Sequence, residues 1–196
     1  MQLNEGKVQE VRELQGKTKQ KILNEALTFN DVRKLRAELE KQGFKPSWQR
    51  VTTLQASTEL SGQMVSTSIT AIPFTNGDEL AVITFVSNEY GKAAAATVKK
   101  DGALTINIYD RAKDRVMNIA STWTCAACQV VVSWICDYFG TKLSYSGCVW
   151  LCLKSANPII VAACTGICFF MVYTLGSTLA CTFSSGWICA KVGLCP

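Results

Sequence analysis

Histidine is absent from this chain of 196 residues, and cysteine does not occur before Cys125. The missing histidine excludes Ser-His and Cys-His catalysis and any zinc site that needs imidazole. The first residues are charged and polar, without the apolar stretch of a secretory signal or a twin arginine. Release from the cell would therefore need a dedicated exporter, cell lysis or a different start of the chain, and we expect a dedicated exporter. Basic side chains are mixed with acidic ones and form no nucleic-acid-binding stripe. We expect no enzymatic activity, no cofactor, no metal ion and no nucleic-acid partner.

Charge is scarce in the second part of the chain. Residues 155–190 contain no charged side chain, and four of the five tryptophans lie after residue 118. This shift in composition predicts a domain boundary, with residues 1–118 on one side and residues 119–196 on the other. The charged side chains beyond the boundary are Asp137, Lys142, Lys154 and Lys191.

Two helices are expected near the N-terminus. Residues 4–27 carry apolar side chains at a loose three-to-four spacing, which predicts a helix. A second helix begins near Thr28 or Asn30, has a clearer apolar face, and is stopped by Gly43 and Pro46.

Residues 61–109 change to a period of two, which is typical of strands. Asn76-Gly77 and Asp101-Gly102 are turn dipeptides. The alanines at 93–96 are compatible with a strand or with the start of a helix. We expect an α+β domain in which two helices cover one face of a four-stranded antiparallel meander, with strands at residues 65–71, 80–86, 93–100 and 103–109.

The spacing of the ten cysteines is nearly a palindrome centred on Pro158. Cys152 and Cys164 are equidistant from this proline, and so are Cys148 and Cys168. The symmetry predicts five nested disulfides, although ten cysteines allow many pairings and the sequence alone does not decide among them. The nested pairs are Cys125–Cys195, Cys128–Cys189, Cys136–Cys181, Cys148–Cys168 and Cys152–Cys164.

The inner pairs have a structural basis. Each C-x3-C motif places its cysteines at i and i+4, on one face of a helix. Two such helices, folded antiparallel around a turn at residues 155–158, bring four sulfurs together, with Pro158 near the first position of the second helix. Bridges would also stabilise a tail of about 75 residues, which is near the lower size limit for a stable core. Ten thiols are typical of an exported protein rather than a cytosolic one.

Two other roles for the cysteines remain open. Cysteine also serves as a small buried hydrophobic residue. Cys125 and Cys128 form a C-x2-C motif, which occurs in thioredoxin-type redox sites and in zinc knuckles. The sequence upstream predicts no βαβ unit, however, and there is no second C-x2-C motif. A thiol or metal protein of this kind would contain stoichiometric zinc or a reactive thiol.

The apolar run in residues 155–190 allows two interpretations. Hydropathy alone predicts a transmembrane helix, and the alternative that follows is an integral membrane protein with a cytosolic N-terminal domain and spans near residues 120–139 and 156–183. Glycine, serine and cysteine interrupt the run, which favours a stapled bundle of apolar helices. Such a bundle would need a membrane or a protein cover. Tryptophans suit the water–lipid interface, although each is also compatible with a core position; those expected to face a membrane are Trp123, Trp134, Trp150 and Trp187.

The C-terminal motifs resemble those of a known family. The segment CAACQVVVSWIC at residues 125–136, the later C-x3-C pairs and the final CAKVGLC at 189–195 are similar to the halocin-type cysteine-rich bacteriocins. In that family an antimicrobial peptide is cut from the C-terminus of a longer precursor, and the upstream part is linked with immunity. The resemblance covers residues 119–196 and implies no catalytic residues. This chain lacks the twin-arginine signal and the strongly acidic composition of the archaeal members.

The cysteine spacing alone is also similar to that of the saposin-like domains, which are compact helical folds that bind and perturb lipid. Three nested bridges in that family join the first and last, the second and fifth, and the third and fourth cysteines. The resemblance implies an all-α, disulfide-stapled, saposin-like C-terminal domain. It implies three of the five nested pairs: Cys125–Cys195, Cys128–Cys189 and Cys152–Cys164.

Together these features predict the precursor of a secreted antimicrobial peptide. Residues 1–118 would be a leader or immunity domain that keeps the peptide inactive in the cytoplasm or at the membrane, and residues 119–196 would perturb the membranes of competing cells. The expected partners are the lipid membrane of target cells, the N-terminal domain or an immunity protein, and a dedicated exporter and protease. The charged run at residues 110–115 is a protease-accessible hinge. The expected cleavage region contains Arg115, Asn118, Ala120 and Ser121.

Overall fold

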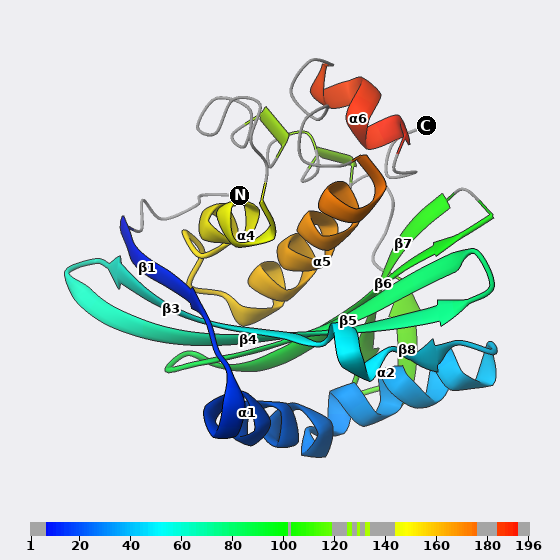
Figure 1. Cartoon of the computed structure of the whole chain (residues 1–196), viewed down its shortest axis with the longest axis horizontal. Coiled ribbons are helices and arrows are strands. Elements are labelled where there is room, and N and C mark those ends of the chain that lie inside the picture. Colours follow the sequence, from blue (N-terminus) through cyan, green and yellow to red (C-terminus); the bar gives the residue numbers. More distant parts are fainter. Residues whose placement is uncertain are drawn as a thin grey trace.

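The computed structural model describes residues 7–101, 103–118, 125–126, 129, 132–133, 144–175 and 184–191. An antiparallel sheet occupies the middle of the molecule, and helices lie on both of its faces (Figure 1). Two helices from the N-terminal part cover one face. The long helix of the cysteine-rich part crosses the other face.

Within the described residues, eight strands form the sheet. Their order is β1-β3-β4-β5-β6-β7-β8, every neighbouring pair is antiparallel, and the short β2 pairs with β4. The strands are β1 (Lys7–Glu13), β2 (Lys45–Pro46), β3 (Thr52–Leu60), β4 (Gln63–Asn76), β5 (Glu79–Asn88), β6 (Gly91–Lys100), β7 (Ala103–Asp110) and β8 (Arg115–Asn118).

The helices come from both parts of the chain. The N-terminal part contributes α1 (Gly16–Thr28) and α2 (Asn30–Lys41), and a short 3-10 helix at Trp48–Arg50 leads into β3. The described part of the cysteine-rich segment is helical, as expected from the sequence. No described helix is both long enough and apolar enough to cross a membrane. The cysteine-rich helices are α4 (Tyr145–Cys152), α5 (Pro158–Leu175) and α6 (Ser185–Lys191).

The N-terminal part is mostly sheet, so the expectation of two helices on a four-stranded meander was wrong. The segment expected to be helical from residue 4 runs first as β1. Its Val8 is buried and pairs with Thr58 of β3; valine is β-branched and packs well on a pleated surface. Gly16, at a φ of +57°, then turns the chain into α1.

Strands β3 and β8 account for much of the larger sheet. In β3 the buried positions include Ala56 and Thr58, which are small or polar and weaken the alternation that marks a strand. β8 has only four residues and follows a tight turn at residues 111–114. The charged run expected to be a hinge is this turn, in which Asp114 has a φ of +44°.

Several local expectations are confirmed. Helix α2 begins at Asn30 and ends before Gly43. The Asn76-Gly77 turn joins β4 to β5, with Gly77 at a φ of +58°. The alanines at 93–96 belong to a strand, β6.

Strands β5 and β6 are buried on both faces. Consecutive side chains of a strand point to opposite faces, so Val82 and Val86 lie in one apolar cluster while Ile83 and Phe85 lie in another. The second cluster is closed by α1 and α2. The first cluster includes the buried residues of α4 and α5, and the cysteine-rich part therefore shares a core with the sheet.

Candidate functional site: the disulfide-stapled hairpin on the sheet

The α4–α5 hairpin has sequence signals at the start of each helix. The Ser144 hydroxyl accepts a 3.1 Å hydrogen bond from the Gly147 amide and so caps α4. The Asn157 side chain accepts a 3.0 Å hydrogen bond from the Ile159 amide at the start of α5. Pro158 occupies the first position of α5, as expected.

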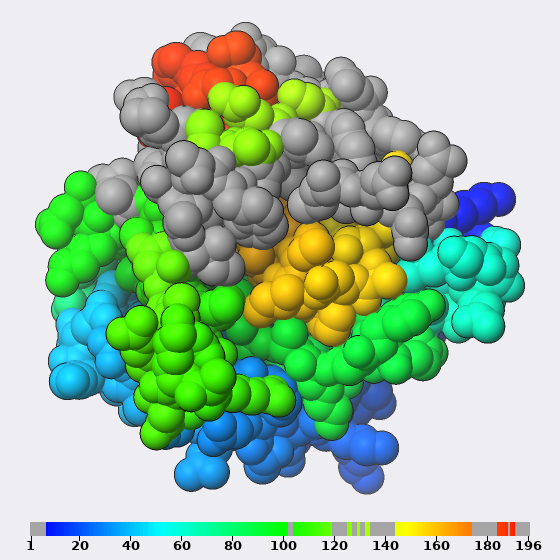
Figure 2. All heavy atoms as spheres, turned by 180° about the vertical axis from the view of Figure 1, so that it is seen from behind, coloured from blue at the N-terminus to red at the C-terminus, as the bar shows by residue number. Residues whose placement is uncertain are grey.

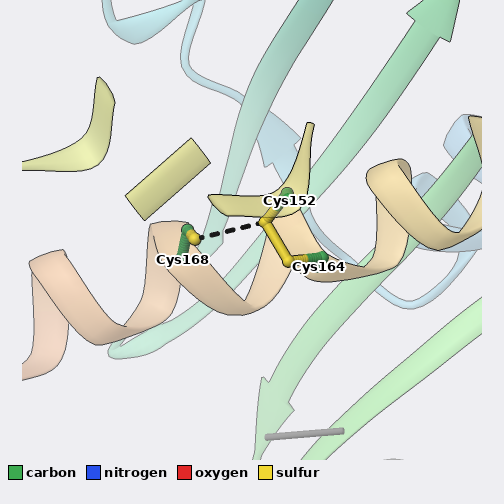
Figure 3. A group of neighbouring side chains, drawn as sticks. All are labelled: Cys152, Cys164 and Cys168. Atoms are coloured by element: carbon green, nitrogen blue, oxygen red, sulfur yellow. Dashed lines mark hydrogen bonds between the residues drawn. A yellow bond between two sulfur atoms is a disulfide. The ribbon is translucent and has the colours of Figure 1, made fainter. Parts of the chain in front are cut away.

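Two disulfides join the helices of the hairpin. They are Cys148–Cys168 and Cys152–Cys164, with Cα atoms 5.6 and 5.7 Å apart, and they are the two inner pairs of the nested series. The Sγ atoms of Cys152 and Cys168, which belong to different bridges, lie 3.6 Å apart (Figure 3). A bridged sulfur carries no proton, so this is a van der Waals contact between the bridges rather than a hydrogen bond.

The outer cysteines are described only in part. Cys125 and Cys189 are each disulfide-bonded, and Cys189 is buried in the same apolar cluster as α5. None of the cysteines in the described residues is free. The three outer pairs of the nested series remain predictions, because four members lie outside the described residues: Cys128, Cys136, Cys181 and Cys195.

Helix α5 is enclosed along its middle. Every residue from 161 to 171 is buried. One side of the helix packs against β5 and β6, and α4 packs beside it, where α4 also contacts β1 (Figure 1). The helix has no charged side chain. A helix that is apolar all round requires such an enclosure, because it has no polar face to offer to water.

Gly166 is a point of very close approach between α5 and the sheet. A Cβ atom at this position would overlap the Thr97 hydroxyl of β6, and it would lie 3.2 Å from the Thr97 Cβ and 3.7 Å from the Thr84 Oγ1 of β5. With 3.6 residues per turn, Cys164 and Cys168 lie about 160° around the helix from Gly166. The helix therefore turns its glycine toward the sheet and its sulfurs toward α4.

Three buried threonine hydroxyls on this face of the sheet have no hydrogen-bond partner within the described residues. They belong to Thr58, Thr84 and Thr97, each of which is at most 1% exposed. Thr84 and Thr97 lie at Gly166, and Thr58 points to the same face as Ala56 of the shared cluster. A buried hydroxyl without a partner costs roughly 1–3 kcal/mol. At Thr84 and Thr97 the contact with α5 is therefore weaker than a purely apolar one would be.

The start of α5 reaches the surface. Figure 2 shows its yellow-orange atoms beside the green strands on the rear face of the molecule. Pro158, Ile159 and Ile160 are half-buried. The Asn88 side-chain amide of β5 donates a 3.4 Å hydrogen bond to the Ala156 carbonyl in the α4–α5 turn. This polar contact ties the turn to the sheet.

The tryptophans expected to face a membrane lie in different surroundings. Trp150, on α4, is partly buried against the shared cluster, and the Lys154 Nζ lies 5.8 Å from the centre of its ring. Trp187, on α6, is 40% exposed. Trp123 and Trp134 lie outside the described residues. In this state Trp150 contributes to the core, whereas Trp187 is accessible.

The expected cleavage region begins on β8, which is an edge strand of the sheet formed by the described residues. Arg115 and Asn118 lie on β8 and are exposed, while Ala120 and Ser121 lie outside the described residues. β8 is the last strand in the order of the sheet and pairs with β7. An edge strand presents backbone groups to which an extended partner can pair, and this is one way in which a peptide segment is recognised.

A polar cleft of about 620 Å³ lies on the other side of the sheet, between α2 and strands β7 and β8. The Lys34 Nζ lies 2.9 Å from the Asp114 carboxylate, to which the Tyr109 hydroxyl also donates a hydrogen bond. The hydrogen bonds from Tyr109 and Lys34 lower the pKa of Asp114, and the hydrogen bond to Asp114 raises the pKa of each donor. Nearby, Arg111 donates to Asp31 at 3.0 Å. These contacts hold the β7–β8 turn against α2.

Comparison of the chain with protein-family models, with curated proteins and with solved structures finds no match. The resemblance to the halocin-type bacteriocins and the saposin-like spacing therefore rest on the cysteine motifs alone.

The sheet side of the site was missed by sequence reasoning. The cysteines were singled out, but Gly166, Thr84 and Thr97, which set the distance between α5 and the sheet, were not. The available signal was the glycine inside an apolar helical segment, together with the four alanines of β6. Residues with little or no side chain permit close approach of two backbones.

Proposed function

We propose that the chain is the precursor of a secreted antimicrobial peptide, and that its N-terminal sheet keeps the peptide inactive. Residues 119–196 would form the peptide, which perturbs the membranes of competing cells. Residues 1–118 would form the leader or immunity domain. The peptide acts without catalysis and is released by a protease that cuts after β8.

The enclosure of α5 is the observation that carries this proposal. A free α5 would present apolar side chains all round. In the structure, β5 and β6 cover the side of the helix that carries Gly166; Ala162 and Phe170 lie within about 40° of it. Removal of the sheet would expose this side as an apolar surface suited to lipid. The peptide contains three lysines and one aspartate, so its small positive net charge attracts anionic lipid only weakly. Insertion into the membrane therefore depends mainly on apolar area.

The unpartnered threonines support release of the peptide rather than permanent docking. The hydroxyls of Thr84 and Thr97, which face Gly166 of the docked α5, are buried and have no partner in the described residues. Once α5 leaves, water can hydrogen-bond to them, which recovers roughly 1–3 kcal/mol for each hydroxyl. Valine in place of these threonines would hold the peptide more tightly, and it would leave a more apolar sheet surface after the peptide is released.

The disulfides support a peptide that survives separation from the sheet. The bridges of the hairpin span sequence separations of 20 and 12 residues, and loops of this size are typically stabilised by about 3 kcal/mol per bridge. Such bridges persist in an oxidising environment outside the cell. They would keep α4 on α5 after the sheet has gone.

The position of α5 also favours this function over an integral membrane protein. In that alternative, residues 156–183 span the bilayer. A helix that spans the bilayer cannot at the same time pack against β5 and β6, as α5 does here. Uncleaved protein that is extracted from cells only by detergent would support the alternative.

Controlled cleavage tests the proposed function. A site for a specific protease is inserted after Asn118 in the full-length chain, and the oxidised protein is assayed before and after cutting. We expect the cut protein to kill indicator cells and to release dye from lipid vesicles, and the uncut protein to do neither. The unaltered chain, treated with the same protease, is the matched control and should stay inactive.

Each outcome of this experiment has a distinct meaning. Equal killing by the uncut chain would refute the inactivating role of the sheet. Failure of the cut and fully bridged protein to kill any of a broad panel of cells would refute the antimicrobial function. Killing without vesicle leakage would replace membrane perturbation by action on a protein receptor. Full killing by the reduced peptide would show that the bridges are not needed for activity.

A further inference from the structure

We propose that the four cysteines of the α4–α5 hairpin bind one zinc ion in the reduced precursor, and that formation of the two bridges later expels it. The inference rests on the proposed function in one respect, because the chain must pass through a reducing compartment before export. In that compartment the two bridges are open and four thiols lie in one place.

The sulfur positions are close to those that zinc requires. Three of the four sulfurs, the Sγ atoms of Cys152, Cys164 and Cys168, lie within 4.8 Å of one another, and their side chains are drawn in Figure 3. The fourth, Cys148 Sγ, is bonded to Cys168 and lies more than 4.8 Å from Cys152 or Cys164. A tetrahedral site with Zn–S bonds of about 2.3 Å places its sulfurs about 3.8 Å apart. The Sγ atoms of Cys152 and Cys168 are already 3.6 Å apart.

Opening the bridges supplies the remaining geometry. Bonded sulfurs are about 2.0 Å apart, so the two sulfurs of each bridge must separate by about 1.8 Å to reach the spacing of a zinc site. Cys148 Sγ must in addition approach the sulfurs of the other bridge. Rotation of the cysteine side chains between staggered positions can move the sulfurs while the helices stay in place. The helices are also held independently of the bridges, because α4 packs against α5 in the shared apolar cluster and α5 contacts the sheet at Gly166.

The chemistry of the site selects a soft cation. Each helix contributes two ligands at i and i+4, and convergence of ligands from facing helices is a common way to build a metal site in a helical bundle. Thiolates prefer zinc and copper(I) to magnesium or calcium. Cys148 and Cys168 are fully buried, and Cys164, at 9% exposed, is the most accessible of the four. The ion would therefore enter and leave past Cys164.

Zinc binding and bridge formation exclude each other. Four thiols and one Zn²⁺ give a tetrathiolate site of charge −2 and release four protons. A disulfide oxidant, either a small molecule or a disulfide-exchange protein, then reacts with the thiolates by thiol–disulfide exchange. Two molecules of this oxidant accept four electrons and four protons and become four thiols, while two protein bridges form and Zn²⁺ departs. The ion keeps the correct sulfurs together until oxidation.

Cobalt and zinc binding to the reduced, full-length chain tests the proposal. One variant retains only the inner four cysteines and is prepared without oxygen, with the substitutions C125S, C128S, C136S, C181S, C189S and C195S. We expect it to bind one Co²⁺ with the absorption spectrum of tetrahedral thiolate coordination, and Zn²⁺ to displace the cobalt. A second variant, which carries C152S and C164S in addition, should bind neither ion. Circular dichroism establishes that both variants are folded.

A measurement on the first variant alone guards against a folding defect in the second. Addition of a disulfide oxidant to its zinc complex should release one Zn²⁺ for every two bridges formed, as followed with a chromophoric chelator and by mass spectrometry. Absence of a thiolate–cobalt spectrum at micromolar metal would overturn the proposal, and so would zinc that stays bound after both bridges have formed. Metal bound by the unaltered chain but not by the first variant would assign it to the outer cysteines, which also overturns the proposal.

These results are separable from the proposed function. A chain without zinc affinity could still be cleaved and kill, which would remove the metal site and leave the precursor function intact. A chain that binds zinc in the hairpin but is never cleaved or exported would refute the precursor function and leave the metal site intact.

Discussion

Replacement of Gly166 by alanine should loosen the contact between α5 and the sheet without weakening α5 itself. The new Cβ would overlap the hydroxyl of Thr97, which is fully buried on a strand covered on both faces. Overpacking of a well-packed core costs roughly 1–3 kcal/mol, and the upper end applies here because Thr97 is short and enclosed. Alanine also favours the helix by about 1 kcal/mol relative to glycine. The net loss in the free energy of unfolding is therefore about 2 kcal/mol, or roughly 30-fold in the equilibrium constant.

The substitution Thr97→Ala provides the matched control for this prediction. It removes the hydroxyl that the new methyl group meets and leaves a 3.2 Å contact with the Cβ. The Thr97 hydroxyl has no partner in the described residues, so its loss is favourable. Alanine also lacks the threonine methyl group, whose lost packing offsets this gain, and T97A alone should therefore be nearly neutral. We expect the double variant G166A/T97A to recover most of the loss, which corresponds to a coupling free energy of about 1–2 kcal/mol.

Urea unfolding of the oxidised full-length chain measures these differences, with circular dichroism and tryptophan fluorescence as probes. In the peptide after cleavage, where the sheet contact is absent, G166A should leave helicity unchanged or raise it. A G166A precursor as stable as the unaltered chain would refute the close contact. An equal loss in the T97A background would show that the loss does not arise from Thr97.

Three further predictions concern other parts of the molecule. Thr84→Val removes a buried, unpartnered hydroxyl and should stabilise the uncut chain by roughly 1 kcal/mol while slowing release of the cut peptide; lower stability in urea would contradict this. The double variant C148S/C168S opens a bridge of sequence separation 20 and should lose about 3 kcal/mol in thermal unfolding, and an unchanged melting temperature would count against it. Asp114→Ala should lower the pKa of Tyr109 toward 10.0, because it removes the hydrogen bond that raises this pKa. Since the folded pKa is the higher one, the contact stabilises the fold below about pH 10 and is lost as the pH rises further; tyrosinate absorbance measures the titration, and a curve unaffected by the substitution would refute the assignment.

The central strands of the sheet could be predicted from residues close together in the sequence. Its outer strands could not, because they depend on pairing with distant residues. The apolar run of β5 and the Asn76-Gly77 turn each determine structure within a few residues. The sequences of β1 and β3 do not determine a strand locally. β1 places only one valine deep in the core, and the core positions of β3 include Ala56 and Thr58, which are small or polar. Their strand state depends on pairing with each other across many residues of chain.

The same distinction applies to the candidate site. The inner disulfides could be predicted because i and i+4 positions on two antiparallel helices fix their geometry. The cover over α5 could not, because it depends on the match between Gly166 and strands that lie far away in the sequence. The sequence indicated that an apolar bundle needs a membrane or a protein cover, and in this state the cover is the sheet.

Intact-mass spectrometry of the culture supernatant, before and after reduction, tests the precursor function most directly. We predict a secreted species with the mass of the chain from about residue 119 to residue 196, which gains about ten mass units on reduction, two for each of five bridges. A full-length chain that stays with the cells and gains no mass on reduction would contradict the proposed function.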